Sequence, residues 1–161
     1  RSWQKRHRKP VWREREDMMS GKRVITFGTF DLFHIGHLHI LERARGLGGA
    51  LVVGVSSDAL NFSKKGRYPV YPTAHRLEIV RALRCVDEVF TEESLERKRA
   101  YLVEHRADVL VMGDDWAGRF DEFRDVCEVV YLPRTPVISS SEIKVVCQYG
   151  RDEMQTCWDA V

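Results

Sequence analysis

The sequence lacks long hydrophobic runs and has few residues that break regular structure. No stretch approaches the roughly 18–20 apolar residues of a membrane span, and the first twenty residues contain no apolar segment typical of a signal peptide. Only 5 prolines interrupt the 161 residues, of which 43% are hydrophobic, so the composition excludes collagen-like and disordered chains. We expect one soluble, cytoplasmic globular domain.

Closely spaced cysteines are also absent. Cys85, Cys127, Cys147 and Cys157 match neither the spacing of zinc ligands nor a CxxC redox motif. Free, mostly buried thiols in a reducing compartment are therefore expected.

Charge is concentrated at the amino terminus. Residues 1–20 carry seven Lys and Arg against three acids, a net charge of +4, which leaves −2 on residues 21–161. This balance predicts a basic N-terminal extension over 1–20, disordered or peripheral, a globular domain over 21–150 and a short tail over 151–161. No nucleic-acid partner is expected, and contact of the extension with an anionic membrane is a less favoured hypothesis.

Short runs of β-branched residues alternate with helix-like segments from Lys22 onward. The polar stretch Asn61–Pro72 is predicted to be a basic loop. The pattern predicts an α/β, Rossmann-like fold: a doubly wound, parallel five-stranded sheet with helices on both faces. The expected strands are Val24–Phe27, Ala50–Ser56, Glu88–Phe90, Val109–Met112 and Glu128–Leu132, and the expected helices are Gly36–Leu47, Thr73–Arg84, Ser94–His105, Arg119–Asp125 and Ser139–Gln148.

Two histidines follow the first predicted strand, where such sheets bind their ligands. They belong to the run GTFDLFHIGH, residues 28–37. His34 and His37 are three positions apart and share a helix face, beside backbone N–H groups suited to phosphate. The third histidine, His39, faces elsewhere and is expected to be structural.

The run GTFDLFHIGH resembles the signature of the HxGH nucleotidyltransferase superfamily. Three later runs, RCVDEV (84–89), MGDDW (112–116) and RTPVISSS (134–141), resemble those of the cytidylyltransferases, in the same order. The similarity spans residues 22–144.

The resemblance implies that a phosphate oxygen of an alcohol phosphate attacks the α-phosphorus of CTP and releases pyrophosphate, with Mg²⁺ carried on the triphosphate. It implies catalytic roles for His34, His37, Lys64 and Arg134, and a homodimer. The residues implied to bind the nucleotide are Gly28, Thr29, Phe30, Asp58, Asp114, Asp115, Trp116, Thr135, Ile138, Ser139 and Ser140.

Acceptor binding is expected from Asp31, Lys65, Arg67, Arg76 and Arg84, and whether Lys65 or Arg67 is the family's second loop cation stays open. Glycerol 3-phosphate is favoured, because the basic loop does not suit a choline head. Ribitol 5-phosphate, phosphoethanolamine, phosphocholine, adenylyl transfer from ATP and a non-catalytic nucleotide sensor are the alternatives. The letters HIGH also occur in aminoacyl-tRNA synthetases, but no KMSKS-like run is present.

Overall fold

A computed structural model describes residues 21–136 and 139–149. In these ranges the chain forms one sheet, in the order β3-β2-β1-β4-β5, and every neighbouring pair is parallel. The predicted fold class is confirmed. The expectations for the basic extension, for Ile138 and for the C-terminal tail lie outside the described residues. The strands are β1 (Arg23–Gly28), β2 (Ala50–Ser56), β3 (Glu88–Glu92), β4 (Val109–Gly113) and β5 (Glu128–Leu132).

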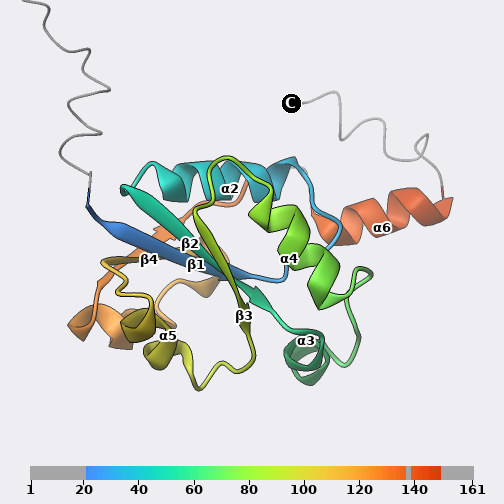
Figure 1. The fold of residues 1–161 in the computed structure, drawn as a ribbon. Coiled ribbons are helices and arrows are strands. Elements are labelled where there is room, and N and C mark those ends of the chain that lie inside the picture. Colours follow the sequence, from blue (N-terminus) through green and yellow to red (C-terminus); the bar gives the residue numbers. More distant parts are fainter. Residues whose placement is uncertain (1–20, 137–138, 150–161) are drawn as a thin grey trace, which may run out of the picture.

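Helices cover both faces of the sheet (Figure 1). Helices α2 (Ile35–Arg45) and α4 (Thr73–Arg81) pack on one face, and α5 (Lys98–Glu104) with the 3-10 segment η2 (Asp121–Asp125) packs on the other. The remaining elements are α3 (Asp58–Lys65), the 3-10 segment η1 (Asp114–Trp116) and α6 (Ser140–Tyr149). Within the described ranges, none of these helices is both long and apolar enough to cross a bilayer.

Alternating side chains of the strands form two separate cores. Val24 and Val53 pack with Leu41 of α2 on one face. Ile25 and Phe27, from alternate positions of β1, pack with the α5 side. Both faces of the central strands are therefore buried, which is why their sequences are almost continuously apolar.

Gly54 of β2 permits a close approach of aromatic rings. A Cβ atom at this position would lie 2.5 Å from Cδ1 of Phe27 and 2.8 Å from Cζ of Phe90. Phe27 and Phe90 meet edge to face, with ring centroids 5.8 Å apart. The missing side chain lets Phe27 lie across β2, near the carboxyl end of the sheet.

The polar stretch predicted as a loop begins as a helix. Ser57 caps α3 by accepting the backbone N–H of Leu60, and Gly66 ends it with a left-handed φ of 67°. Residues 61–65 are therefore helical, and Lys64 lies in the last turn. The prediction was wrong because α3 buries only Leu60 and the polar Asn61, so the sequence lacks the repeating apolar positions that usually indicate a helix.

Two other helices differ from the prediction. Helix α4 begins at Thr73 as expected, with Pro72 at the cap position, but ends at Arg81 rather than Arg84. The hydroxyl of Thr73 accepts the backbone N–H of Asp58. Helix α5 begins at Lys98 rather than Ser94, because the Ser94 hydroxyl accepts the N–H of Glu96 in a separate turn.

The cysteines of the described ranges are free, as predicted. Cys127 is buried, Cys85 is half-buried and Cys147 is exposed, so the expectation of mostly buried thiols holds only in part. Burial raises the pKa of the Cys85 and Cys127 thiols, which makes both poor nucleophiles. Cys157 lies outside the described residues.

Candidate active site

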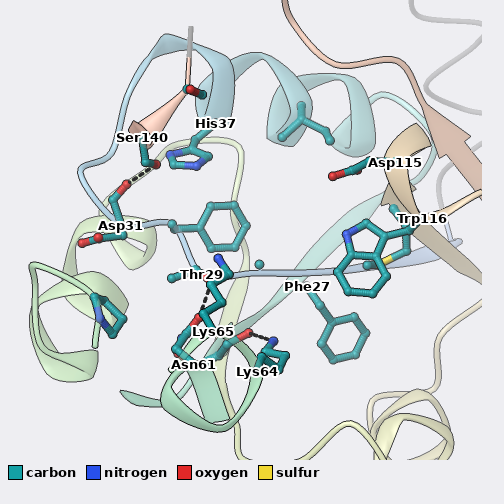
Figure 2. A pocket seen from close by; sticks show the side chains of 18 of the residues that line it. Phe27, Thr29, Asp31, His37, Asn61, Lys64, Lys65, Asp115, Trp116 and Ser140 are labelled. Atoms are coloured by element: carbon teal, nitrogen blue, oxygen red, sulfur yellow. Dashed lines mark hydrogen bonds between the residues drawn. The ribbon is translucent and has the colours of Figure 1, made fainter. Parts of the chain in front are cut away.

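A cavity of about 670 Å³ opens at the carboxyl ends of the strands, where the strand order reverses between β1 and β4. Figure 2 shows Asp31 and Ser140 on one side of it and Trp116 on the other, with Thr29 between them. The structure brings fifteen of the predicted site residues to its lining: Gly28, Thr29, Phe30, Asp31, His34, His37, Lys64, Lys65, Arg67, Asp115, Trp116, Arg134, Thr135, Ser139 and Ser140.

The two signature histidines stand together at the start of α2. His34 caps the helix, and its Nδ1 accepts the backbone N–H of Gly36 at 3.1 Å. A neutral His34 ring therefore carries its proton on Nε2. The ring of His37 stacks on that of His34, with centroids 3.8 Å apart. Together the two rings form one aromatic wall of the cavity.

The surroundings of both histidines favour the neutral ring. Burial lowers the pKa of His37 to about 3, helped by His34 and Arg134, whereas Asp31 acts in the opposite direction. Burial also lowers the pKa of His34, and Arg134 adds to this. Nδ1 of His37 is buried without a hydrogen-bond partner among the described residues. A bound anion would raise the pKa of both rings, because its negative charge stabilises a proton on either of them.

Lysines and arginines reach the cavity from several separated segments of the chain. Lys64 and Lys65 come from the end of α3, and burial lowers the pKa of both ammonium groups. Arg67 follows in the α3–α4 loop, and Arg134 comes from the segment after β5. The cavity thus has the charge of a site for a polyanion.

Asp31 connects the α3–α4 loop to α6. Its carboxylate accepts the backbone N–H groups of Val70 and Tyr71 at 2.9 and 3.0 Å, and it pairs with Lys144 of α6 at 3.3 Å. The backbone carbonyl of Asp31 accepts the hydroxyl of Ser140 at 2.8 Å. The pKa of the Asp31 carboxyl is lowered: burial would raise it, but these hydrogen bonds and Lys144 outweigh burial. The Asp31 carboxylate thus anchors the α3–α4 loop to α6, and the expectation that Asp31 binds the acceptor stays a prediction.

Arg76 lies beneath the cavity rather than in it. Its side chain is fully buried, and its guanidinium donates to the carbonyls of Tyr71, Thr29 and Ser56 and to the carboxylate of Asp58. All these bonds are made to the protein, so Arg76 holds the strand ends together. This corrects the expectation of acceptor binding by Arg76 and of nucleotide binding by Asp58.

Two further expected residues do not line the cavity. Arg84 is exposed in the segment between α4 and β3. Asp114 begins η1 and does not line the cavity, although its neighbours Gly113, Asp115 and Trp116 do. The site roles expected of Arg84 and Asp114 stay predictions. His39 lies in a separate shallow hollow with Glu42 and Arg134, in agreement with the expectation that it faces elsewhere.

The sequence reasoning missed a polar cluster in the cavity wall. Glu92, at the end of β3, and Lys98, at the start of α5, are each 2% exposed or less and form an ion pair. Glu92 also accepts the hydroxyl of Ser56 at 2.6 Å, and Ser56 accepts an N–H of Lys64 at 3.4 Å. Charged residues in a polar stretch give no sign of burial, so no sequence signal could have found this cluster.

The fold and the site define a Rossmann-type nucleotidyltransferase: paired histidines at the first helix start and cations from distant segments surround one cavity at the strand ends. A family model described as cytidylyltransferase-like matches residues 25–146. The chain belongs to this cytidylyltransferase-like family, as its motifs predicted.

Curated relatives and a solved structure agree with this membership. Glycerol-3-phosphate cytidylyltransferase of Bacillus subtilis (strain 168) is 52% identical over 124 residues, which cover 76% of this chain and 95% of that protein. The protein of the same name from Staphylococcus aureus (strain NCTC 8325 / PS 47) is 43% identical over 131 residues, 81% of this chain and 98% of that protein. The lipopolysaccharide core biosynthesis protein from Thermoplasma volcanium GSS1 has a TM-score of 0.62 at 25% identity, covering 71% of this chain and 98% of that one.

Proposed function

We propose that this enzyme transfers CMP from CTP to glycerol 3-phosphate, giving CDP-glycerol and pyrophosphate. The observation that carries the proposal is the convergence of two histidines, four lysines and three arginines on one cavity. The substrates are inferred from the relatives named glycerol-3-phosphate cytidylyltransferase, which match this chain over most of their length.

The reaction requires positioning and charge stabilisation rather than a protein nucleophile. A phosphate oxygen of glycerol 3-phosphate forms a bond to the α-phosphorus of CTP, and the bond from that phosphorus to the bridging oxygen breaks as pyrophosphate leaves. His34 and His37 donate hydrogen bonds to the phosphates as negative charge develops, with the N–H groups at the start of α2 beside them.

The remaining contacts with CTP and the acceptor are assigned from the side of the cavity on which each residue lies. Arg134, with the hydroxyls of Ser139 and Ser140 at the start of α6, binds the leaving β- and γ-phosphates. Asp115 and Trp116 lie on the opposite side and contact the nucleoside (Figure 2). Lys64 bridges the α-phosphate and the acceptor phosphate.

Lys65 and Arg67 both line the cavity, and both are proposed to contact the acceptor. The pKa of Lys65 is lowered by burial, Arg67 and Lys144, so an acceptor phosphate would hold its proton in place. Two cations only two residues apart suit a phosphate that carries a small neutral polyol. They do not suit the cationic head of phosphocholine.

Magnesium is proposed to enter with CTP. Within the described ranges, no group of three histidine, cysteine, aspartate or glutamate side chains could hold a metal ion. The Asp31 and Glu92 carboxylates in the cavity are engaged by protein donors, which leaves Asp115. Such a lining fits Mg²⁺ held by phosphate oxygens, water and at most one carboxylate. When bound, the ion would neutralise charge on the triphosphate.

A homodimer in the cytoplasm completes the proposal. Tyr68 and Val70, both more than half exposed, and the exposed Tyr71 present an apolar surface beside the cavity, which suits an interface between copies. Sedimentation velocity tests the dimer. A nucleic-acid partner is not proposed. The hypothesis of membrane contact rests on residues 1–20, which lie outside the described residues.

One assay tests the proposed reaction. Pyrophosphate release is measured with ATP, CTP, GTP or UTP against glycerol 3-phosphate, ribitol 5-phosphate, phosphoethanolamine and phosphocholine. Release is expected with CTP and glycerol 3-phosphate at a kcat/KM at least tenfold above every other pair. A higher kcat/KM with another acceptor or with ATP would refute the proposed substrates. Binding of CTP without release under any condition would indicate a nucleotide sensor.

A further inference from the structure

A single buried carboxylate connects two lysines of the cavity wall. Glu92 is 1% exposed, yet the protein supplies just two side-chain partners to it among the described residues, Lys98 and Ser56. One carboxylate oxygen accepts the Lys98 ammonium, and the other accepts the Ser56 hydroxyl at 2.6 Å. Ser56 in turn accepts an N–H of Lys64 at 3.4 Å.

The strand register brings these groups together. Ser56 and Glu92 are the last residues of β2 and β3 and are direct partners in the parallel ladder. Lys98 reaches them from α5, with Nζ 3.4 Å from the centre of the Phe27 ring. The aromatic face and the carboxylate confine this ammonium. Lys64 is on the far side of Ser56, at the end of α3.

The charges of the cluster leave an excess of one cation. Glu92 and Lys98 compensate each other, so a buried carboxylate does not repel a phosphate in the cavity. Lys64 then provides the net positive charge, at a position that Ser56 defines. A buried ion pair often contributes little to the free energy of unfolding. We therefore look for the role of Glu92 and Lys98 in the site.

We propose that Glu92 is a positioning residue for acceptor binding, holding the ammonium of Lys98 directly and that of Lys64 through Ser56. This rests on the proposed function, because it assumes that an acceptor phosphate meets Lys64. Glu92 itself does not touch the reacting atoms. Its effect reaches the acceptor through the place and the charge of the two lysines.

Protonation of the lysines gives the proposal a specific signature. Burial lowers the pKa of Lys98 to about 8, with Glu92 opposing the shift and Lys64 adding to it. Burial and Lys65 lower the pKa of Lys64, and Glu92 opposes this too. Loss of the Glu92 charge should therefore deprotonate both lysines at lower pH.

The experiment compares Glu92→Gln with Glu88→Gln, the same substitution at the other end of the same strand. Glu88 pairs with Arg23 and His105, away from the cavity. Kinetics are measured from pH 6 to 9 with each substrate varied. For Glu92→Gln, the KM for glycerol 3-phosphate at pH 8 should rise about tenfold or more, with the KM for CTP within about twofold. The alkaline limb of kcat/KM for the acceptor should move to lower pH by about one unit, whereas Glu88→Gln should match the wild type.

Ser56→Ala is the second variant, and it decides if Glu92→Gln does not fold. It removes the Ser56 hydroxyl that links Glu92 to Lys64 and leaves the ion pair of Glu92 with Lys98 in place, so a smaller, severalfold rise in the acceptor KM is expected. An unchanged acceptor KM in either folded variant, or an equal loss of affinity for CTP, would overturn the proposal.

The pKa values of the lysines are read directly from ¹³Cε chemical shifts in lysine-labelled protein. This measurement needs no turnover, so it remains decisive if the wild-type enzyme does not use glycerol 3-phosphate. In that case the proposed function fails, while a lowered Lys98 pKa in Glu92→Gln would still support the positioning by Glu92. An unshifted Lys98 pKa would refute it.

Discussion

The imidazole rings of His34 and His37 stack with 3.8 Å between centroids and 23° between planes. Two protonated rings at this distance would repel each other, which is one cause of the lowered pKa of His37. The proposed triphosphate changes this balance because its negative charge compensates protons or N–H dipoles on both rings. The stacked pair is therefore suited to stabilise a charge that arrives and grows during the reaction.

Replacing His37 by alanine should reduce kcat far more than stability. The ring supplies a hydrogen bond where charge develops, and loss of one such donor typically costs a factor of about 10²–10³ in kcat. Pyrophosphate release at saturating CTP and acceptor measures this effect, and thermal unfolding measures stability. His75→Ala is the matched control, because His75 is exposed on α4 outside the cavity. A His37→Ala enzyme with more than half of the wild-type kcat would contradict the assignment.

The same ring should make the folded state sensitive to acid. The pKa of His37 is about 3 in the folded protein against 6.5 for the ordinary group, so the unfolded chain binds an extra proton between these values. Stability should fall as pH decreases below about 6.5, by up to about 1.4 kcal/mol per pH unit from this residue. In His37→Gln that part of the slope should vanish.

Urea unfolding at pH 7, 6 and 5 provides the measurement. The free-energy difference between wild type and His37→Gln should shrink with each step towards acid, by roughly 2 kcal/mol in all if the full slope applies. His75→Gln should retain the wild-type slope. Parallel curves for wild type and His37→Gln would show that the buried ring does not control this titration.

The fold could be predicted from sequence because apolar runs such as 50–56 are buried on both faces by helices. The positions of His34 and His37 could also be predicted, because a helix start after a strand brings both rings to the same side. Helix α3 was overlooked. The sequence contains a residue type typical of a helix N-cap at Ser57 and one typical of a helix end at Gly66, but the polar residues between them suggested a loop.

The errors at Arg76 and Asp58 have a different origin. A motif records that a residue type recurs near a site, and it does not distinguish contact with ligand from support beneath it. Arg76 is buried by the fold and bonded to strand-end carbonyls, which only tertiary structure reveals. The pair of Glu92 and Lys98 could not be predicted for the same reason, since its partners come from different elements.

Replacing Arg76 by methionine should destabilise the whole domain. The substitution leaves the carbonyl of Thr29 without its side-chain donor, removes one of two side-chain donors from the carbonyl of Ser56 and leaves Asp58 without its cation. Leaving a buried hydrogen-bonding group unsatisfied typically costs about 1–3 kcal/mol. Urea unfolding measures the loss, and Arg81→Met, an exposed arginine on the same helix, is the control. A loss below about 1 kcal/mol would show that the guanidinium contacts contribute little.

Replacing Lys64 by alanine should separate acceptor binding from folding. A charge-assisted hydrogen bond to a phosphate contributes about 1.5–3 kcal/mol, so kcat/KM for glycerol 3-phosphate should fall roughly 10- to 100-fold. The free energy of unfolding should change by less than about 1 kcal/mol, because Lys64 is at a helix end and its one side-chain bond is long, at 3.4 Å. Lys22→Ala is the matched control, since Lys22 pairs with Glu128 at the opposite edge of the sheet. Unchanged kinetics in Lys64→Ala would mean that the acceptor phosphate does not contact Lys64, and the bridging role would then pass to Lys65 or Arg67, whose alanine variants are measured in the same assay.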